Sequence, residues 1–387
     1  MSYEKFGLSE NPFLSSKADY PVIDRVEVMA ELGRIVGRYV EADGPALIAL
    51  LGDYGIGKTA VLQNIISHVG AGTFLPESPR PLRVAYMKAL PPDSTSKYAL
   101  YVLRSVVKGL GLGTFLSWKE KAEADSGTPM VMPPALAQAG TDIAKAIHAL
   151  RTTTRPGRAW AYLQAEKLSV SDLSALSLGH SVDTNERAQS ALIGMLKLSK
   201  RMGESGVLLL IDEWEYLFTA TSSAKAVQIH TAIKDIYDRQ REAQNTGAEI
   251  APFIVLIACT PLAWERNIPR YLKAVNAPGI EPFAQRIGAE YRLKPLDRKD
   301  TTKLIASRLR ARRIGGVANP LLPFTDEAIQ QVYQLSQGAP RKVLDECAYL
   351  LEQCLIEQRD KIDEDFAKDK LASFEFPLSP SRGDDRP

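Results

Sequence analysis

The sequence predicts an α/β protein in which a parallel sheet is flanked by helices. Three observations carry this prediction. Apolar, strand-like runs alternate with amphipathic helical segments along most of the chain. Two of these runs, residues 206–212 and 253–260, are apolar almost throughout, as expected when helices cover both faces of a sheet. A glycine-rich segment with the spacing Gly-x-x-x-x-Gly-Lys-Thr joins the first run to a helical segment.

The positions of the individual elements follow from the same alternation. Strands are expected at residues 46–51, 82–88, 206–212, 253–260 and 290–293. Helices are expected at residues 26–42, 59–69, 94–111, 185–202, 224–243 and 282–287. Further helices at 298–313, 325–336 and 341–358, with a shorter one at 364–374, predict a small helical lid.

These elements predict a chain of four parts. Residues 1–45 form an N-terminal segment and the first helix of the core, residues 46–296 the α/β core, residues 297–376 the lid, and residues 377–387 a tail expected to be disordered. Within the core, residues 112–184 are rich in glycine, proline, alanine and serine and are interpreted as an insertion. Its parts at 134–150 and 160–176 are expected to be helical.

The composition narrows the functional class. The 387 residues are 45% hydrophobic and carry a net charge of +2, so a nucleic-acid partner must be argued from local clusters. No run of 18 apolar residues and no signal peptide is recognised, so we expect a cytoplasmic protein without a membrane partner. The scattered cysteines, Cys259, Cys347 and Cys354, are expected to pack in the core rather than bind zinc or form disulfides.

A candidate phosphate-binding loop lies between the first predicted strand and the following helix. It consists of Gly52, Asp53, Tyr54, Gly55, Ile56, Gly57, Lys58 and Thr59, with Ala60 in the first helical turn. Glycines at these positions let backbone N–H groups face phosphate oxygens. Lys58 is expected to reach the β- and γ-phosphates, and Thr59 is expected to hold Mg²⁺. The alternative is a glycine-rich turn without a ligand, but the flanking strand and helix favour nucleoside triphosphate binding.

A second motif supplies acidic groups. The apolar residues 207–211 are followed by Asp212 and Glu213. Phosphoryl transfer needs a carboxylate near the metal and a group that polarises the attacking water, so Asp212 is predicted to hold Mg²⁺ and Glu213 to act on the water. A surface pair of carboxylates is the alternative. Trp214, which follows, is expected to pack in the core or to contact a neighbouring molecule.

Together these motifs resemble those of the AAA+ ATPases, and the resemblance extends over residues 6–373. It implies that Thr260 takes the place of the sensor-1 residue that orients the water, where many members carry Asn. It also implies that Arg286 is the arginine finger that reaches a neighbouring subunit's γ-phosphate. Arg292 is the next candidate, and Arg266 and Arg270 remain open, as does a plain salt bridge for Arg286.

Two more segments carry the resemblance. Gly338-Ala339-Pro340-Arg341 resembles the sensor-2 motif, which implies that Arg341 contacts the bound triphosphate. The alternative is an ordinary surface arginine behind a helix-starting proline. The segment 6–13 and the following residues resemble the stretch that wraps adenine in several bacterial members, which implies adenine contacts at Val22 and Ile23. The choice of ATP over GTP rests on this resemblance alone.

The resemblance is strongest to the initiator-like branch, which includes origin-recognition ATPases, transposition-targeting ATPases and phage-defence P-loop proteins. It implies a homo-oligomer, as a ring or spiral, that acts on double-stranded DNA. The absence of a winged-helix region after the lid argues against a replication initiator. Two basic clusters are candidate DNA contacts: Arg151, Arg155 and Arg158 in the insertion, and Arg308, Arg310, Arg312 and Arg313 at the end of the first lid helix. Solvated helical faces are the alternative for both clusters.

Two other functions remain open at this stage. The insertion would dock a protein partner through its segments 130–134 and 160–176 if the chain is a protein-directed switch or remodeller. A nucleotide-gated assembly protein with slow hydrolysis is the other possibility, and Thr260 in place of Asn favours it.

Overall fold

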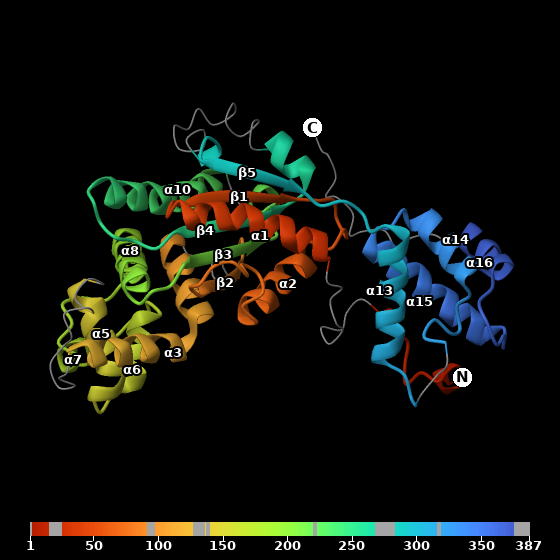
Figure 1. Cartoon of the computed structure of the whole chain (residues 1–387), viewed down its shortest axis with the longest axis horizontal. Helices are drawn as coiled ribbons and strands as arrows, with labels where there is room; N and C mark the ends of the chain where they lie inside the picture. Colours follow the sequence, from red (N-terminus) through yellow and green to blue (C-terminus); the bar gives the residue numbers. More distant parts are fainter. Residues whose placement is uncertain are drawn as a thin grey trace. The chain divides into compact units, whose positions relative to one another are not determined.

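The computed structural model describes residues 2–14, 25–90, 97–126, 136, 140–219, 223–267, 283–315 and 319–374 (Figure 1). The chain divides into two compact units. The first, here called the helical unit, comprises Met1–Arg25, Asp53–Val61 and Leu293–Pro387. The second, the sheet unit, comprises Val26–Gly52 and Leu62–Arg292. The predicted adenine contacts Val22 and Ile23, the finger candidate Arg270 and the tail 377–387 lie outside the described residues.

The sheet unit contains a five-stranded parallel sheet in the order β2-β3-β4-β1-β5, so the predicted parallel α/β class is confirmed (Figure 1). The strands are β1 (Ala46–Leu51), β2 (Leu82–Lys88), β3 (Gly206–Asp212), β4 (Phe253–Cys259) and β5 (Ile287–Arg292). Every residue of β1, β3 and β4 is buried, which explains their continuous apolar sequence. The edge strand β5 alternates between half-buried and exposed residues.

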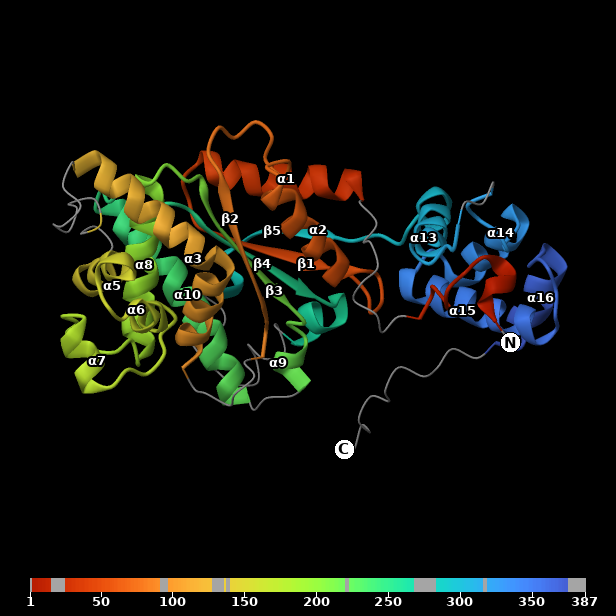
Figure 2. The ribbon, with the colours of Figure 1, turned by 90° about the horizontal axis from the view of Figure 1, so that it is seen from below.

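Helices cover both faces of the sheet. They are α1 (Val26–Glu41), α2 (Lys58–Gly70), α3 (Tyr98–Ser126), α8 (Asn185–Arg201), the short α9 (Tyr216–Thr219) and α10 (Ser223–Asn245). The chain runs from β1 to β2 in one direction along the sheet and returns through β3 to β4. Because crossovers between parallel strands are right-handed, α2 from Leu62 onward covers the face opposite to α8 and α10 (Figure 2).

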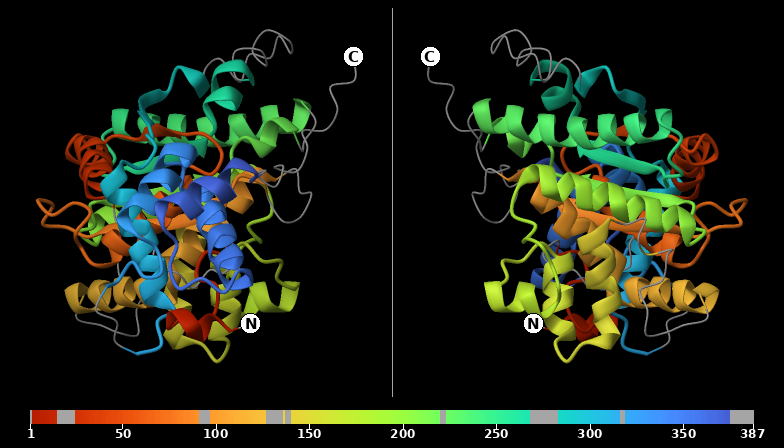
Figure 3. Two further views of the ribbon diagram at one scale, coloured as in Figure 1. Left: turned by 90° about the vertical axis from the view of Figure 1, so that its right-hand side faces the viewer. Right: turned by 90° about the vertical axis from the view of Figure 1, so that its left-hand side faces the viewer.

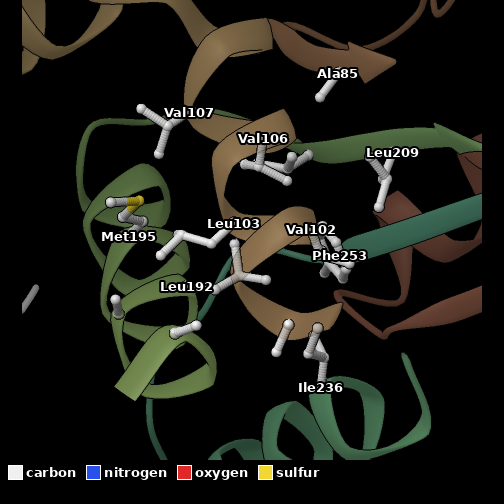
Figure 4. Close-up of a cluster of buried hydrophobic side chains, with 14 of the residues drawn as sticks. Ala85, Val102, Leu103, Val106, Val107, Leu192, Met195, Leu209, Ile236 and Phe253 are labelled. Carbon is white, nitrogen blue, oxygen red and sulfur yellow. The ribbon is translucent and has the colours of Figure 1, made fainter. Parts of the chain in front are cut away.

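The main core lies between the sheet and the helices α3, α8 and α10. Figure 4 shows Val102, Val106 and Leu103 of α3 between the strands and the side chains Leu192 and Met195 of α8. The helix α3 packs tightly against the edge strand β2, since a Cβ added at Gly109 would lie 2.6 Å from Cα of Ala85. The cysteine of this unit, Cys259, is buried, as predicted for a core residue.

The predicted insertion is more closely integrated into the core than its composition suggests. The helix α3 starts at Tyr98 rather than residue 94 and continues to Ser126, past the expected end at Gly111, whose φ of 74° marks a kink. Among the residues described after it are the short helices α5 (Thr141–Thr152), α6 (Pro156–Leu163) and α7 (Val170–Ala175). The ring of Phe115 lies 5.1 Å from that of Trp118 and 5.7 Å from that of Trp160, so α3 and α6 share one core.

A buried carboxylate ties this region to the sheet. Glu204, only 2% exposed, precedes β3 and receives three hydrogen bonds. Arg83 Nε of β2 donates to its Oε1 at 2.6 Å, and Trp118 Nε1 of α3 donates to the same oxygen at 2.9 Å. Ser199 Oγ of α8 donates to Oε2 at 2.8 Å. The network therefore joins a strand and two helices around one charge.

One described helical segment, Tyr98–Ala124, is long and apolar enough to cross a membrane by length and composition, with a mean hydropathy of 1.3 in its most apolar window. Arg104 and Lys108 interrupt this segment, so it passes by average composition and is not the uninterrupted run of 18 apolar residues whose absence the sequence analysis noted. Half of that window is buried inside the protein, against the sheet and α8, as in the core helix of a globular domain.

The helical unit contains the predicted lid. Its helices α13 (Arg298–Ala311), α14 (Asp326–Ser336), α15 (Pro340–Ile356) and α16 (Glu364–Ala372) pack against one another (Figure 3). Thr325, Asp297 and Asp363 cap the N-termini of α14, α13 and α16.

The chain's first described residues belong to the same core. Residues 2–14 include the short 3-10 helix Tyr3–Phe6, and the side chains of Phe6, Leu8 and Phe13 are buried among those of the lid helices. The ring of Phe13 meets that of Phe324 edge-on at 5.6 Å. The segment 6–13, which was expected to lead to the adenine, therefore packs in the lid core.

The residues that lead into β5 differ from the prediction. Of the predicted helix at 282–287, Phe283 and Ala284 are helical and the next two residues form a turn, and β5 already begins at Ile287 rather than at residue 290. Gly288 at the start of this strand lies against Tyr39 of α1, where a Cβ would come within 2.2 Å of the hydroxyl. Because the backbone lies so close to the phenol, this strand position requires a glycine. In the sequence, the same glycine directly follows the predicted helix 282–287.

Candidate functional site

The polar residues of the sheet unit gather where its strands end. In the parallel register, Lys88 at the end of β2 pairs with Asp212 at the end of β3, and Leu51 at the end of β1 pairs with Cys259 at the end of β4. The next residue after β1, Gly52, donates its N–H to the carbonyl of Cys259 at 3.2 Å. Gly52, Asp212 and Thr260 therefore lie at the same edge of one sheet, where open α/β sheets bind ligands.

Asp212 is 2% exposed and is fixed by two donors. Tyr86 donates its hydroxyl to Oδ2 at 3.1 Å, and the backbone N–H of Glu213 donates to Oδ1 at 2.9 Å. Burial and the charge of Asp212 raise the pKa of Tyr86, so the phenol stays protonated and remains a donor. The carboxylate is held in one orientation with hard oxygens of the kind that Mg²⁺ prefers.

Glu213 adopts an unusual backbone conformation. Its φ of 59° lies in the left-handed region, which non-glycine residues seldom adopt. Hydrogen bonds hold the chain on both sides, because the N–H of Glu213 bonds to Asp212 and the N–H of Trp214 donates to the carbonyl of Ala258 at 3.1 Å. Strain of this kind costs on the order of 1 to 3 kcal/mol and is concentrated at functional sites.

The carboxylate of Glu213 is paired in this structure. Lys88 Nζ lies 3.0 Å from its Oε2 and donates a hydrogen bond to Oε1 at 3.2 Å. The hydrogen bond to Glu213 raises the pKa of Lys88. The carboxylate of the predicted catalytic base is thus held by a neighbouring strand, and Lys88 and Tyr86 are site residues that the sequence analysis missed. Their position at the end of a predicted strand beside Asp212 is the signal that could have identified them.

Trp214 packs in the core, as one of the two predictions for it states. Its ring stacks on that of Phe283 at 6.0 Å and meets that of His230 edge-on at 5.2 Å. Burial lowers the pKa of His230 to about 4, so this histidine is neutral and acts as part of an aromatic cluster. Because Arg286 donates its N–H to the carbonyl of Phe283, the cluster also supports the turn that carries Arg286.

The glycine-rich loop from Asp53 onward belongs to the helical unit. The helix α2 begins at Lys58, one residue before the predicted start, and Gly55 and Gly57 have φ values of 79° and 98° that side chains disfavour. The side chain of Lys58 is nearly buried, and its Nζ donates to the carbonyl of Asp53 at 3.3 Å. N–H groups in the first turn of a helix point out of its N-terminus, so the loop has the geometry of an anion cradle.

Arg341 meets this loop within the same unit. It follows Pro340 at the start of α15, and its N–H donates to the carbonyl of Gly55 at 3.2 Å. Two parts of the chain that the sequence analysis assigned to one nucleotide, the loop and the Gly-Ala-Pro-Arg segment, are therefore in direct contact.

The two leading finger candidates form ion pairs within the sheet unit. Arg286 binds Asp238 of α10 with two hydrogen bonds, from Nε at 2.6 Å and from Nη2 at 3.1 Å. Burial alone would raise the pKa of Asp238, but the hydrogen bonds from Arg286 and Lys234 outweigh it and lower this pKa. Arg292 forms an ion pair with Glu265. The salt-bridge alternative for Arg286 thus describes its position in this structure.

Most of the candidate DNA contacts also have partners. Arg155 lies 3.0 Å and Arg158 3.6 Å from the carboxylate of Asp172, and Arg151 pairs with Glu120. Within the lid, Arg312 binds Glu10 at 2.6 Å, and Arg313 donates to the carbonyl of Phe6 at 2.6 Å. Arg312 and Arg313 therefore hold residues 2–14 on the lid.

The other two lid arginines lie at the end of α13. Arg308 is half-buried, and Arg310 is exposed. Of the lid cluster, Arg310 is the side chain that a DNA backbone would reach most readily.

Metal ligation by histidine or cysteine finds no support in the described ranges, because no group of three or more histidine, cysteine, aspartate or glutamate side chains there could hold a metal ion. A Mg²⁺ ion bound through phosphates, water and one or two protein oxygens needs no such group. Asp212 fits this role by its buried, oriented carboxylate.

Comparison with known proteins gives likenesses at low identity. No protein-family model matches the chain. An uncharacterized HTH-type transcriptional regulator of Methanocaldococcus jannaschii is 32% identical over 93 residues, which are 24% of this chain and 22% of that protein.

Several solved structures resemble most of the chain. The Aeropyrum pernix ORC2 protein with ADPNP and ADP is 13% identical, with a TM-score of 0.48, over 94% of this chain and 71% of that chain. Drosophila ORC bound to DNA is 14% identical, with a TM-score of 0.46, over 93% of this chain and 63% of that chain. The Thermotoga maritima RuvB branch migration motor is 14% identical, with a TM-score of 0.38, over 90% and 69%. These structures resemble the chain over most of its length at low sequence identity.

Proposed function

We propose that this chain is a Mg²⁺-dependent ATPase of the AAA+ type that assembles into an oligomer and acts on double-stranded DNA. One observation supports nucleotide binding most directly. The loop 52–57 joins β1 to α2 with positive φ values at Gly55 and Gly57, and it places the nearly buried Lys58 on the carbonyl of Asp53. A cation on a cradle of backbone donors suits the β- and γ-phosphates of a nucleotide.

In the proposed reaction, Lys58 and the loop N–H groups bind the phosphates. Mg²⁺, held by the hydroxyl of Thr59 and the carboxylate of Asp212, would neutralise phosphate charge. Glu213 would leave Lys88 and polarise the attacking water, and Thr260 would orient that water. Arg286 of a neighbouring subunit would reach the γ-phosphate after leaving its own Asp238, a contribution on the order of a thousandfold or more in such enzymes.

The proposed partner and location follow from separate observations. Double-stranded DNA rests on the motif resemblance, and the exposed Arg310 is the best remaining candidate contact. Free, buried cysteines at 259, 347 and 354 suit a reducing compartment, and we propose the cytoplasm as the location.

Substituting Lys58 with alanine tests nucleotide binding. We expect the purified protein to bind ATP in the micromolar range by titration calorimetry, and Lys58→Ala to weaken binding by about a hundredfold, because a cation on the phosphates is lost. His68→Ala, at the far end of the same helix α2, serves as the control and is expected to bind normally. If the wild type binds no nucleoside triphosphate, the proposed function is wrong.

Duplex DNA is expected to raise ATP turnover, and added salt should weaken DNA binding because phosphate contacts release counterions. Arg310→Ala is expected to reduce the slope of log affinity against log salt by about 1. Arg155→Ala is the matched control, since Arg155 is already paired with Asp172. If DNA neither binds nor stimulates turnover, the DNA part of the proposal fails and a protein partner becomes the better hypothesis.

A further inference from the structure

The side chain of Arg341 rests on an aromatic residue of the glycine-rich loop. Its Nη1 donates a hydrogen bond to the hydroxyl of Tyr54 at 2.5 Å. Its Cζ also lies 4.9 Å from the centroid of the Tyr54 ring, within the range of a cation–π interaction. Tyr54 itself is 55% exposed, so this large side chain is not kept in place by burial.

The backbone around this contact has little freedom. The N–H of Arg341 is bonded to the carbonyl of Gly55, and a Cβ added at Gly55 would come within 2.8 Å of Cβ of Arg341. A Cβ at Gly57 would touch Pro340 at 3.8 Å. The backbone at the start of α15 therefore packs directly against the loop. A rearrangement at this site is confined to the side chains of Tyr54 and Arg341.

The guanidinium of Arg341 differs from those of the finger candidates in its partners. Arg286 and Arg292 are neutralised by Asp238 and Glu265. Within the part of the chain that the structure describes, Arg341 forms no ion pair, and its hydrogen-bond acceptor is a neutral phenol. Burial raises the pKa of Asp345, one turn further along α15, while the charge of Arg341 acts in the opposite direction, so the two groups interact without forming an ion pair.

We propose that Tyr54 is a positioning residue that holds Arg341 away from the phosphates until a nucleotide competes for the guanidinium. This inference rests on the proposed function. A phosphate forms charge-assisted, bidentate hydrogen bonds with arginine that a phenol cannot match, so the nucleotide wins this competition. The Tyr54 contact exists only in the free protein, and it lowers the apparent nucleotide affinity by the amount that the contact stabilises that state.

The expected effect is a gain in affinity when the contact is removed. Tyr54→Phe, which keeps the ring and loses the hydrogen bond, should bind ATP about threefold more tightly than the wild type. Tyr54→Ala, which loses both contacts, should bind about tenfold more tightly. Tyr237→Phe is the matched control, because Tyr237 also lies under an arginine, Arg241, but on α10, and it should leave the affinity unchanged.

A double-mutant cycle separates this role from a general structural effect. In an Arg341→Ala background, the Tyr54 substitutions should change ATP affinity by less than about twofold, because the guanidinium that Tyr54 contacts is absent. Weaker ATP binding by Tyr54→Phe, or an equal gain in the Arg341→Ala background, would overturn the inference while leaving nucleotide binding intact. If the wild type binds no ATP, the proposed function itself fails, and this inference fails with it.

Discussion

Glu213→Gln is expected to lower ATP turnover by about 10²- to 10⁴-fold, the range that a general base contributes, while ATP binding stays close to that of the wild type. The amide has the same shape as the carboxylate, but it cannot take up a proton from the attacking water. It also loses the ion pair to Lys88, which lies 3.0 Å away in this structure. Turnover by phosphate release and affinity by calorimetry, measured on the same preparation, would separate the two effects.

Glu215→Gln is the matched control, since it changes a carboxylate two residues later to which the proposal gives no part in hydrolysis. It should retain turnover within about twofold of the wild type. If Glu213→Gln hydrolyses ATP normally, Glu213 is not the base. If the variant loses hydrolysis but keeps the cellular activity of the wild type, the slow, nucleotide-gated assembly protein becomes the better description of this chain.

The same variant tests the oligomer. In a site shared by two subunits, Glu213→Gln and Arg286→Ala protein should each be inactive alone, because each lacks one half of every site. An equal mixture should restore activity at about a quarter of its interfaces, where an intact Glu213 meets an intact Arg286. No recovery in a mixture whose subunits demonstrably exchange would show that Arg286 acts within its own chain, as its bond to Asp238 in this structure also permits.

The largest effect on stability is expected from the buried carboxylate before β3. Glu204→Gln should lower the free energy of unfolding by about 2 to 4 kcal/mol. The substitution removes the negative charge that Arg83 faces at 2.6 Å and disturbs the bonds from Trp118 and Ser199. Arg83 remains one-third exposed, which keeps the expected cost below that of a fully buried pair. Urea unfolding followed by tryptophan fluorescence would measure it.

Two substitutions provide the scale for this measurement. Ser199→Ala removes one hydrogen bond of the same network and should cost about 1 kcal/mol. Glu31→Gln breaks the exposed pair with Arg34 and should leave the stability close to that of the wild type. A Glu204→Gln protein as stable as the Glu31→Gln protein would mean that the network contributes specificity of packing and little free energy.

The sheet and the start of α2 were predictable because they depend on local sequence. The runs at β1, β3 and β4 are apolar since every residue in them is buried, and the glycines of the loop are required by positive φ values. The extent of α3 was not predictable in the same way. Gly111 and Gly113 reduce helix propensity, but Phe115 and Trp118 gain enough burial against Trp160 to carry the helix to Ser126.

The candidate site was predictable by residue type and not by pairing. Asp212 and Glu213 follow an apolar strand, so their place at the sheet edge follows from sequence order. Their partners Tyr86 and Lys88 come from a strand more than a hundred residues earlier, and this pairing depends on the strand order β2-β3. For the same reason, the partners of the arginines could not be assigned from clusters of charge. Asp172 pairs with Arg155, and Glu10 pairs with Arg312, although both arginines belong to basic clusters in the sequence.

The docking of residues 2–14 on the lid has a consequence for how the protein is made. Phe6, Leu8 and Phe13 leave the ribosome about three hundred residues before their apolar partners, which include Phe324 and Val343. During synthesis the sheet unit can therefore form first, while this leading segment stays without its partners until translation has passed the lid helices. A bulky fusion placed directly before Ser2, whose hydroxyl caps the Tyr3–Phe6 helix, would act on the last region to fold rather than on the first.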